Sequence, residues 1–251
     1  MNEALPGWSR AQVAGHVVEL YEPSTPSEHG YVLLYLHGVH LQSLSANAVY
    51  TGEFARLGLR VIAPQTGRSW WADRICPDFD PAITAERYVL DAVLPFVHER
   101  WGTTPPRVAL LGTSMGGQGA LRFSFKYPAR FPIVAALAPA IDYQVRYYEE
   151  EEGTLAQMYD SPEAIRQETA TLHVHPLNWP RNIWFCCDPA DRRWHESTER
   201  LRSKLAAIGI PHDYDLETQA GGHSWAYYDH MAAKALGYIA ERLERERLRV
   251  V

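Results

Sequence analysis

The sequence contains little cysteine, no excess of basic residues and no long apolar run, and each of these absences excludes a class of protein. Only Cys76, Cys186 and Cys187 are cysteines among 251 residues, so we expect no disulfide framework and a reducing, cytoplasmic location. The formal net charge of -6 argues against nucleic acid as a partner. No apolar run reaches the length of a membrane span, and the N-terminal segment lacks the apolar stretch of a signal peptide, so we expect no membrane association.

Short apolar segments alternate with helix-like segments along the chain. Strands are expected at residues 13–21, 31–36, 59–63, 107–111, 131–137, 182–187 and 213–217, and helices at residues 82–101, 118–127, 196–208 and 225–248. Buried strands separated by long helices predict parallel strands with helices on both faces of the sheet. No repeat or linker divides the chain. We therefore expect a single α/β domain over residues 1–251, with a mostly parallel open sheet.

Residues 141–180 interrupt this alternation, because they separate two expected strands by about forty residues. Excursions of this length are usually functional. This one carries several aromatic residues, among them Tyr143, Tyr147, Tyr148 and Tyr159, which is enough surface to wall a pocket. Two interpretations stay open: a cap-like excursion over a site, or a satellite helix packed on the core.

Residues 112–116 read Gly-Thr-Ser-Met-Gly, a G-x-S-x-G pattern. They follow the expected strand at 107–111 and precede the expected helix at 118–127, which is the strand–turn–helix context of a nucleophile elbow. Glycine at both ends of the motif lets strand and helix pass close together. The pattern predicts that Ser114 projects above the sheet edge as a nucleophile, and the alternative is a glycine-rich turn with an incidental serine.

A serine hydroxyl attacks well only when a base accepts its proton and a carboxylate orients that base. His223 follows the last expected strand in Gly221-Gly222-His223, in a loop at the carboxyl edge of the sheet. Two aspartates, Asp188 and Asp191, follow the strand before it. We favour Asp191, which lies further out and can lean toward the histidine. Asp188 is expected to fix its loop by accepting bonds from backbone N–H groups.

Acyl transfer also needs donors for the negatively charged oxygen of its intermediate. Met115, directly after the serine, supplies one backbone N–H, and Val39, after the strand at 31–36, is expected to supply the second. His37 beside Val39's loop is expected to tie that loop down. His173 and His175 form an H-x-H pair without a third ligand at a suitable spacing, so neither a metal nor another cofactor is expected.

The stretch GTSMGGQGALRFSFKY at 112–127, with Pro128, resembles the elbow and following helix of the esterase-D-like branch of the α/β-hydrolases. That branch includes S-formylglutathione hydrolases, feruloyl and acetylxylan esterases, and mycolyltransferases. The loops at 37–38, 191 and 221–223 follow in the family's order. The resemblance implies the α/β-hydrolase fold, no metal cofactor, and Ser114, Asp191 and His223 as triad. It also implies an oxyanion hole at Val39 and Met115. This chain departs from the family pattern at Asp188, because many members have glycine at that position.

We therefore predict a serine carboxylic-ester hydrolase that acts through an acyl-enzyme on a small or medium acyl ester. The alternatives are acyl transfer or peptide hydrolysis on the same fold, or a catalytically silent hydrolase-like binding module. Trp70, Trp71 and Tyr143 are the candidates for the substrate pocket, where the rings could stack on an acyl, aryl or sugar group. Trp70 and Trp71 could equally form a packed hydrophobic corner. The sequence indicates no oligomeric state.

Overall fold

The structure is a computed structural model that describes residues 4–150 and 153–249. It contains an eight-stranded sheet in the order β1-β2-β4-β3-β5-β6-β7-β8. The strands are β1 (Trp8–Val13), β2 (His16–Tyr21), β3 (Val32–Leu36), β4 (Arg60–Pro64), β5 (Val108–Thr113), β6 (Ile133–Leu137), β7 (Asn182–Cys186) and β8 (Asp213–Asp215). β2 pairs antiparallel with β1 and β4, and every other pairing is parallel. The predicted mostly parallel open sheet is confirmed.

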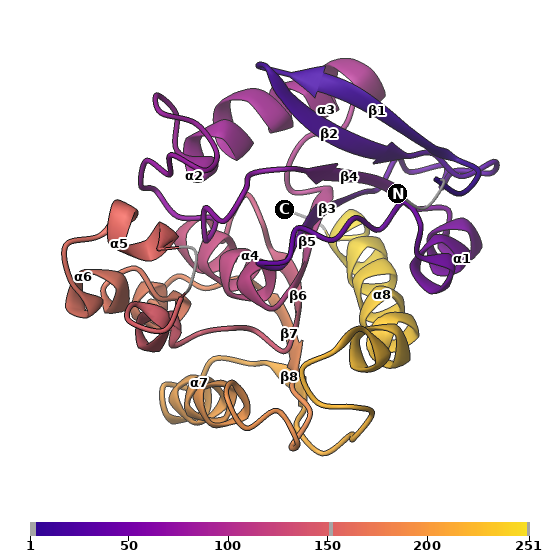
Figure 1. The fold of residues 1–251 in the computed structure, drawn as a ribbon. Coiled ribbons are helices and arrows are strands. Elements are labelled where there is room, and N and C mark those ends of the chain that lie inside the picture. The colour runs from indigo at the N-terminus through magenta and orange to yellow at the C-terminus, as the bar shows by residue number, and fades with distance from the viewer. Residues whose placement is uncertain (1–3, 151–152, 250–251) are drawn as a thin grey trace.

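Helices cover both faces of the sheet (Figure 1). On one face lie α1 (Ala48–Leu57) and α8 (Trp225–Arg247), and on the other lie α4 (Met115–Lys126) and α7 (His195–Ala207). The central strands β3, β5 and β6 are buried over their whole length. Burial on both faces explains why their sequences are apolar runs rather than alternating patterns. None of the described helices combines the length and the apolar composition needed to cross a bilayer.

The helix expected at residues 82–101 forms as α2 (Ala85–Tyr88), a π-helical turn η1 (Val89–Val93) and α3 (Leu94–Trp101). Its start is set by Thr84, whose side chain accepts from the Arg87 N–H. Its end is set by Gly102, which has a φ of 64°. Capping by a hydroxyl at the start and a left-handed glycine at the end are the usual helix limits.

Two features at the N-terminal side differ from the sequence predictions. The expected single strand at 13–21 is wrong at its start, because the chain turns back at Ala14 and Gly15, with φ of 46° and 84°, to form the β1–β2 hairpin. β1 is largely exposed, so its sequence gives only a weak apolar signal. α1 was not predicted, although Asn47 caps it by accepting from the Tyr50 N–H and Gly58 ends it.

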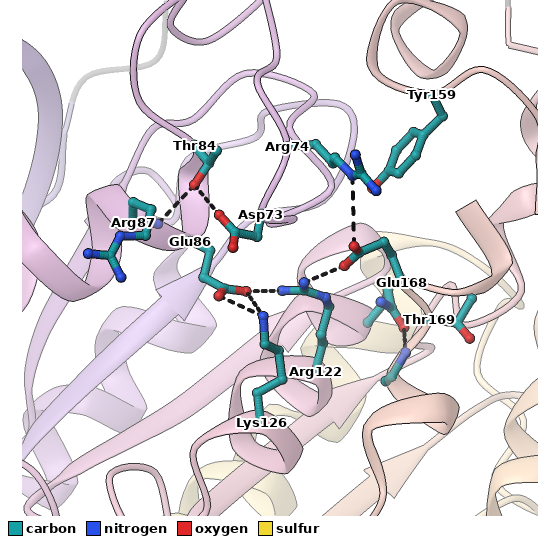
Figure 2. Close-up of polar contacts among 12 residues, drawn as sticks. Asp73, Arg74, Thr84, Glu86, Arg87, Arg122, Lys126, Tyr159, Glu168 and Thr169 are labelled. Carbon is teal, nitrogen blue, oxygen red and sulfur yellow. Dashed lines mark hydrogen bonds and ion pairs between the residues drawn. The ribbon is translucent and has the colours of Figure 1, made fainter. Parts of the chain in front are cut away.

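The excursion between β6 and β7 contains η2 (Tyr143–Arg146), α5 (Thr154–Met158), α6 (Pro162–Arg166) and η3 (Ala170–His173). Its second half is anchored to α4. The Gln118 side chain accepts from the Ala170 N–H at 3.0 Å, and Arg122 forms an ion pair with Glu168 (Figure 2).

Arg122 is the centre of the polar network drawn in Figure 2. Its side chain is 1% exposed and also forms an ion pair with Glu86 of α2, which further binds Lys126 at 2.7 Å. Removing one partner of a buried ion pair costs about 3–5 kcal/mol, because the other charge stays buried alone. The network therefore fixes the end of the excursion and the start of α2 to the helix that follows Ser114.

Candidate active site

Ser114 lies at a tight turn between β5 and α4, with φ 54° and ψ -117°. A left-handed φ at a residue with a side chain costs about 1–3 kcal/mol and is found mainly at functional sites. A Cβ added at Gly112 would come 2.0 Å from the Gly116 oxygen, and one added at Gly116 would come 1.8 Å from the Leu36 oxygen. Both positions therefore require glycine for β3, β5 and α4 to pass this closely.

A continuous chain of hydrogen bonds joins the three residues that the sequence singled out. Ser114 Oγ lies 2.8 Å from His223 Nε2, and His223 Nδ1 lies 2.6 Å from Asp191 Oδ2. Burial alone would raise the pKa of Asp191, but hydrogen bonding and the charge of His223, with two backbone N–H donors, hold that pKa below its usual value. An ionised carboxylate only accepts, so Nδ1 carries the proton and Nε2 is free to accept from the serine hydroxyl.

Asp188 is fully buried and points to the backbone instead of the histidine ring. Its carboxylate accepts from the N–H groups of Ala190, Ala220 and Gly222 at 2.7, 2.7 and 2.8 Å. The expectation that Asp188 fixes its loop through backbone N–H groups is confirmed. The same bonds hold the adjacent loop that carries His223, so Asp188 positions both loops.

We expect Asp188→Asn to lower the free energy of unfolding at neutral pH by about 1–3 kcal/mol, because an amide cannot satisfy all three backbone donors. Burial alone would raise the pKa of Asp188, but the backbone N–H groups hold it below its usual value. The carboxylate's contribution is then complete above about pH 4 and is lost as the pH falls through the folded-state pKa. Urea unfolding from neutral to acid pH measures this, with the exposed Asp213→Asn as control. A stability difference that stays constant into strong acid would contradict the prediction.

The two expected oxyanion donors lie beside Ser114. Met115 is the first residue of α4, and the first N–H groups of a helix have no partner within it. Val39 lines the space next to the serine. Its loop is held by His37, whose Nε2 accepts from the Thr66 N–H at 3.2 Å while Nδ1 donates to the Gly38 oxygen at 2.9 Å. Burial lowers the pKa of His37 to about 4, so the ring stays neutral, and its expected structural role is confirmed.

Two of the three predicted pocket residues do not face the site, and the prediction is corrected for them. Trp71 is fully buried, its Nε1 donates to the His37 oxygen at 3.1 Å, and its side chain fills the space beside Gly119. Tyr143 is also fully buried and stacks on Trp70, with ring centroids 4.5 Å apart. Trp71 therefore forms the packed corner that was the alternative, and Tyr143 supports Trp70 from behind.

Two cavities open beside Ser114 and His223. The smaller, of about 80 Å³, has a mostly apolar lining that includes Trp225 and Tyr228. The larger, of about 200 Å³, is lined by Trp70, Arg146, Arg193 and Trp194. Apart from Trp70, none of these residues was singled out from the sequence. Trp225 and Tyr228 sit on the helix after His223, but residue spacing alone does not distinguish them from their neighbours.

Tyr228, which the sequence did not single out, contacts the His223 ring. Its hydroxyl lies 3.1 Å from His223 Nε2, the same nitrogen that faces Ser114. Burial raises the pKa of Tyr228 far above its ordinary value, so the hydroxyl keeps its proton. The Tyr228 hydroxyl therefore lies beside Nε2, the nitrogen of His223 that also faces the Ser114 hydroxyl.

The H-x-H pair lies away from this arrangement. His175 Nδ1 accepts from the Leu177 N–H at 3.1 Å, and burial lowers the pKa of His173 to about 4. In residues 4–150 and 153–249, no three His, Cys, Asp or Glu side chains are grouped to hold a metal ion.

Comparison with known proteins gives a consistent picture. A family model described as "Putative esterase" matches residues 16–239, and no curated protein matches the chain. An S-formylglutathione hydrolase from Agrobacterium tumefaciens is similar in structure, with a TM-score of 0.78, 18% identity, and 97% of this chain and 98% of that chain covered. A ferulic acid esterase has a TM-score of 0.75 at 14% identity, covering 94% and 97%.

A third similar structure is the fluorophosphonate-binding serine hydrolase F of Staphylococcus aureus, with a TM-score of 0.69, 17% identity, and 96% of each chain covered. At these identities the structural likeness establishes the fold. The expected α/β-hydrolase fold is confirmed.

Proposed function

Because the chain belongs to the family described as "Putative esterase" and is a serine ester hydrolase, we propose that Ser114 is its nucleophile, His223 its general base and Asp191 the carboxylate that orients the base. The observation that carries this proposal is the unbroken chain of hydrogen bonds from Ser114 Oγ through the His223 ring to Asp191. The strained turn that presents Ser114 beside two cavities supports it.

The proposed reaction proceeds in two halves. Ser114 Oγ attacks the ester carbonyl while His223 Nε2 takes its proton, and Asp191 stabilises the imidazolium that forms. His223 then gives the proton to the leaving alcohol, and an acyl-enzyme remains on Ser114. Water, deprotonated by His223, then attacks the acyl group, and His223 returns this proton to Ser114 Oγ as the bond to the acyl group breaks and the acid leaves.

The backbone N–H groups of Val39 and Met115 are the proposed donors to the carbonyl oxygen as it becomes negative. One is at the start of α4, where the helix dipole also favours negative charge, and the other is in the loop that His37 holds. Each preorganised donor of this kind is worth about 3–4 kcal/mol in the transition state. The small volume of the cavity beside Trp225 and Tyr228, about 80 Å³, favours a short chain on one side of the ester.

We further propose that the enzyme works in the cytoplasm. All three cysteines are buried and free, and free thiols persist best in a reducing compartment.

The test is labelling and turnover by the wild-type protein. We expect an alkyl fluorophosphonate to label one site, located by peptide mass spectrometry on the peptide that contains Ser114. We also expect p-nitrophenyl esters to be hydrolysed, and a rate that falls from acetate to octanoate would place the acyl part in the smaller cavity. A silent binding module would be neither labelled nor active, and that result would reject the proposal.

A further inference from the structure

The larger of the two cavities has an unbalanced charge. Two arginines, Arg146 and Arg193, line it beside Ser114 and His223, and among the described residues that line it there is no aspartate or glutamate. The remaining walls include the rings of Trp70 and Trp194. A low-dielectric wall strengthens the field of a nearby charge. The cavity is therefore suited to a ligand group of negative charge.

Arg146 is held in place by its helical turn. It is the last residue of η2, and Tyr143 at the start of η2 is buried, stacked on Trp70 and bonded through its hydroxyl to Tyr159 at 3.1 Å. Within the part of the chain that the structure describes, Arg146 forms no ion pair, and its Nε–H is buried without an acceptor. The turn that carries Arg146 is thus anchored by Tyr143, and no carboxylate among the described residues pairs with its positive charge.

Arg193 contributes less charge to the cavity. Its backbone N–H donates to Asp191 Oδ1 at 3.2 Å, which fixes its place in the site. Its guanidinium is 2.8 Å from the carboxylate of Glu149 and lies over the Trp194 ring at 5.9 Å. Both side chains of that ion pair are about half exposed, so solvent screens the pair. Glu149 nevertheless offsets much of the charge of Arg193, so Arg146 attracts an anionic ligand more strongly than Arg193 does.

Building on the esterase activity proposed above, we propose that the substrates of this enzyme are esters that carry a carboxylate on one of their two parts. The guanidinium of Arg146 binds the carboxylate in the larger cavity, with Arg193 as a second contact, and the neutral part of the ester occupies the smaller apolar cavity. A planar guanidinium binds a carboxylate through two parallel hydrogen bonds, and this binding places the ester carbonyl at Ser114.

The test compares matched esters that differ in one charge. Mono-p-nitrophenyl glutarate and p-nitrophenyl pentanoate differ on the acyl side, and 4-acetoxybenzoate and 4-acetoxybenzamide differ on the alcohol side. In at least one pair, we expect wild-type kcat/KM to be about tenfold higher for the anionic ester, as one charge-assisted hydrogen bond provides. The preference should fall as salt is added. The pair that shows it identifies which part of the ester lies in the larger cavity.

The second part of the test uses variants of Arg146 with the same pairs of esters. Arg146→Met keeps the apolar stem and should abolish the preference of about tenfold, mainly through KM, whereas Arg146→Lys should retain part of it. Arg166→Met, an exposed arginine of α6 paired with Glu163, should change neither ester. Glu149→Gln releases Arg193 and should raise the preference a further ~2-fold, in line with a screened pair. An equal loss on both esters with Arg146→Met, or no preference in the wild type, would overturn the inference while leaving the esterase intact.

A binding measurement separates charge recognition from catalysis. Calorimetry with Ser114→Ala and 4-acetoxybenzoate or glutarate should show binding that the added Arg146→Met weakens by about tenfold. If the fluorophosphonate labels nothing and no ester turns over, the catalytic proposal fails, and this binding experiment still decides the role of Arg146. Binding that is unaffected by Arg146→Met would reject the carboxylate site.

Discussion

Ser114→Ala should lower kcat for p-nitrophenyl acetate by about 10⁶-fold, the loss measured when a hydrolase loses its nucleophile. Alanine has no hydroxyl to form the acyl-enzyme, and among the described residues only one other hydroxyl, that of Tyr228, is hydrogen-bonded to His223. Tyr228 lies 3.1 Å from His223 Nε2, but burial raises its pKa far above the ordinary value, which disfavours the phenolate that would have to attack. Initial rates with active-site titration by an alkyl fluorophosphonate measure both turnover and labelling.

The same substitution should leave stability almost unchanged. Alanine and serine have a similar conformational strain at a φ of 54°, and Asp191 continues to hold the histidine to which Ser114 Oγ bonds. Thermal unfolding of Ser114→Ala should therefore match that of Ser203→Ala, an exposed serine on α7. Fluorophosphonate labelling of Ser114→Ala at the wild-type level would place the nucleophile elsewhere.

The parts of the site that sequence reasoning reached are those set by local pattern. The elbow combines a strand, two glycines and a serine within a short segment, and the steric reason for the glycines appears directly as the 2.0 and 1.8 Å approaches at Gly112 and Gly116. The loop that carries His223 follows the last strand, and loops after parallel strands lie at the edge of the sheet where α/β sites form. Local sequence and fold agree at these points, so the prediction required no knowledge of packing.

The pocket could not be derived in the same way. Whether an aromatic ring faces a cavity or the core depends on partners far away in the chain. Trp70 and Trp71 are neighbours with similar φ of 52° and 54°, yet only Trp70 reaches the cavity, because Trp71 is held by the His37 oxygen. Arg146 enters the site from an excursion whose position depends on Tyr143, and no periodicity in the sequence predicts that contact.

Asp191→Asn should lower kcat by about 10⁴-fold, and Asp188→Asn should lower it far less. Asp191 Oδ2 lies 2.6 Å from His223 Nδ1 and keeps the proton on that nitrogen. An asparagine amide that donates to Nδ1 would move the proton to Nε2. Nε2 could then no longer accept from Ser114 Oγ, and the base would be lost while the geometry stayed intact.

Asp188 has no comparable path to the chemistry, because its carboxylate bonds to backbone N–H groups and not to the His223 ring. Its loss should appear first in unfolding free energy and only then, through the loops it holds, in kcat. Measuring kcat and urea unfolding for both variants therefore separates the two roles: Asp191→Asn should lose nearly all of its kcat, and Asp188→Asn should lose stability while most of its kcat remains. The reverse ranking of kcat would assign the orienting carboxylate to Asp188, and it would require His223 to turn away from Asp191 during the reaction.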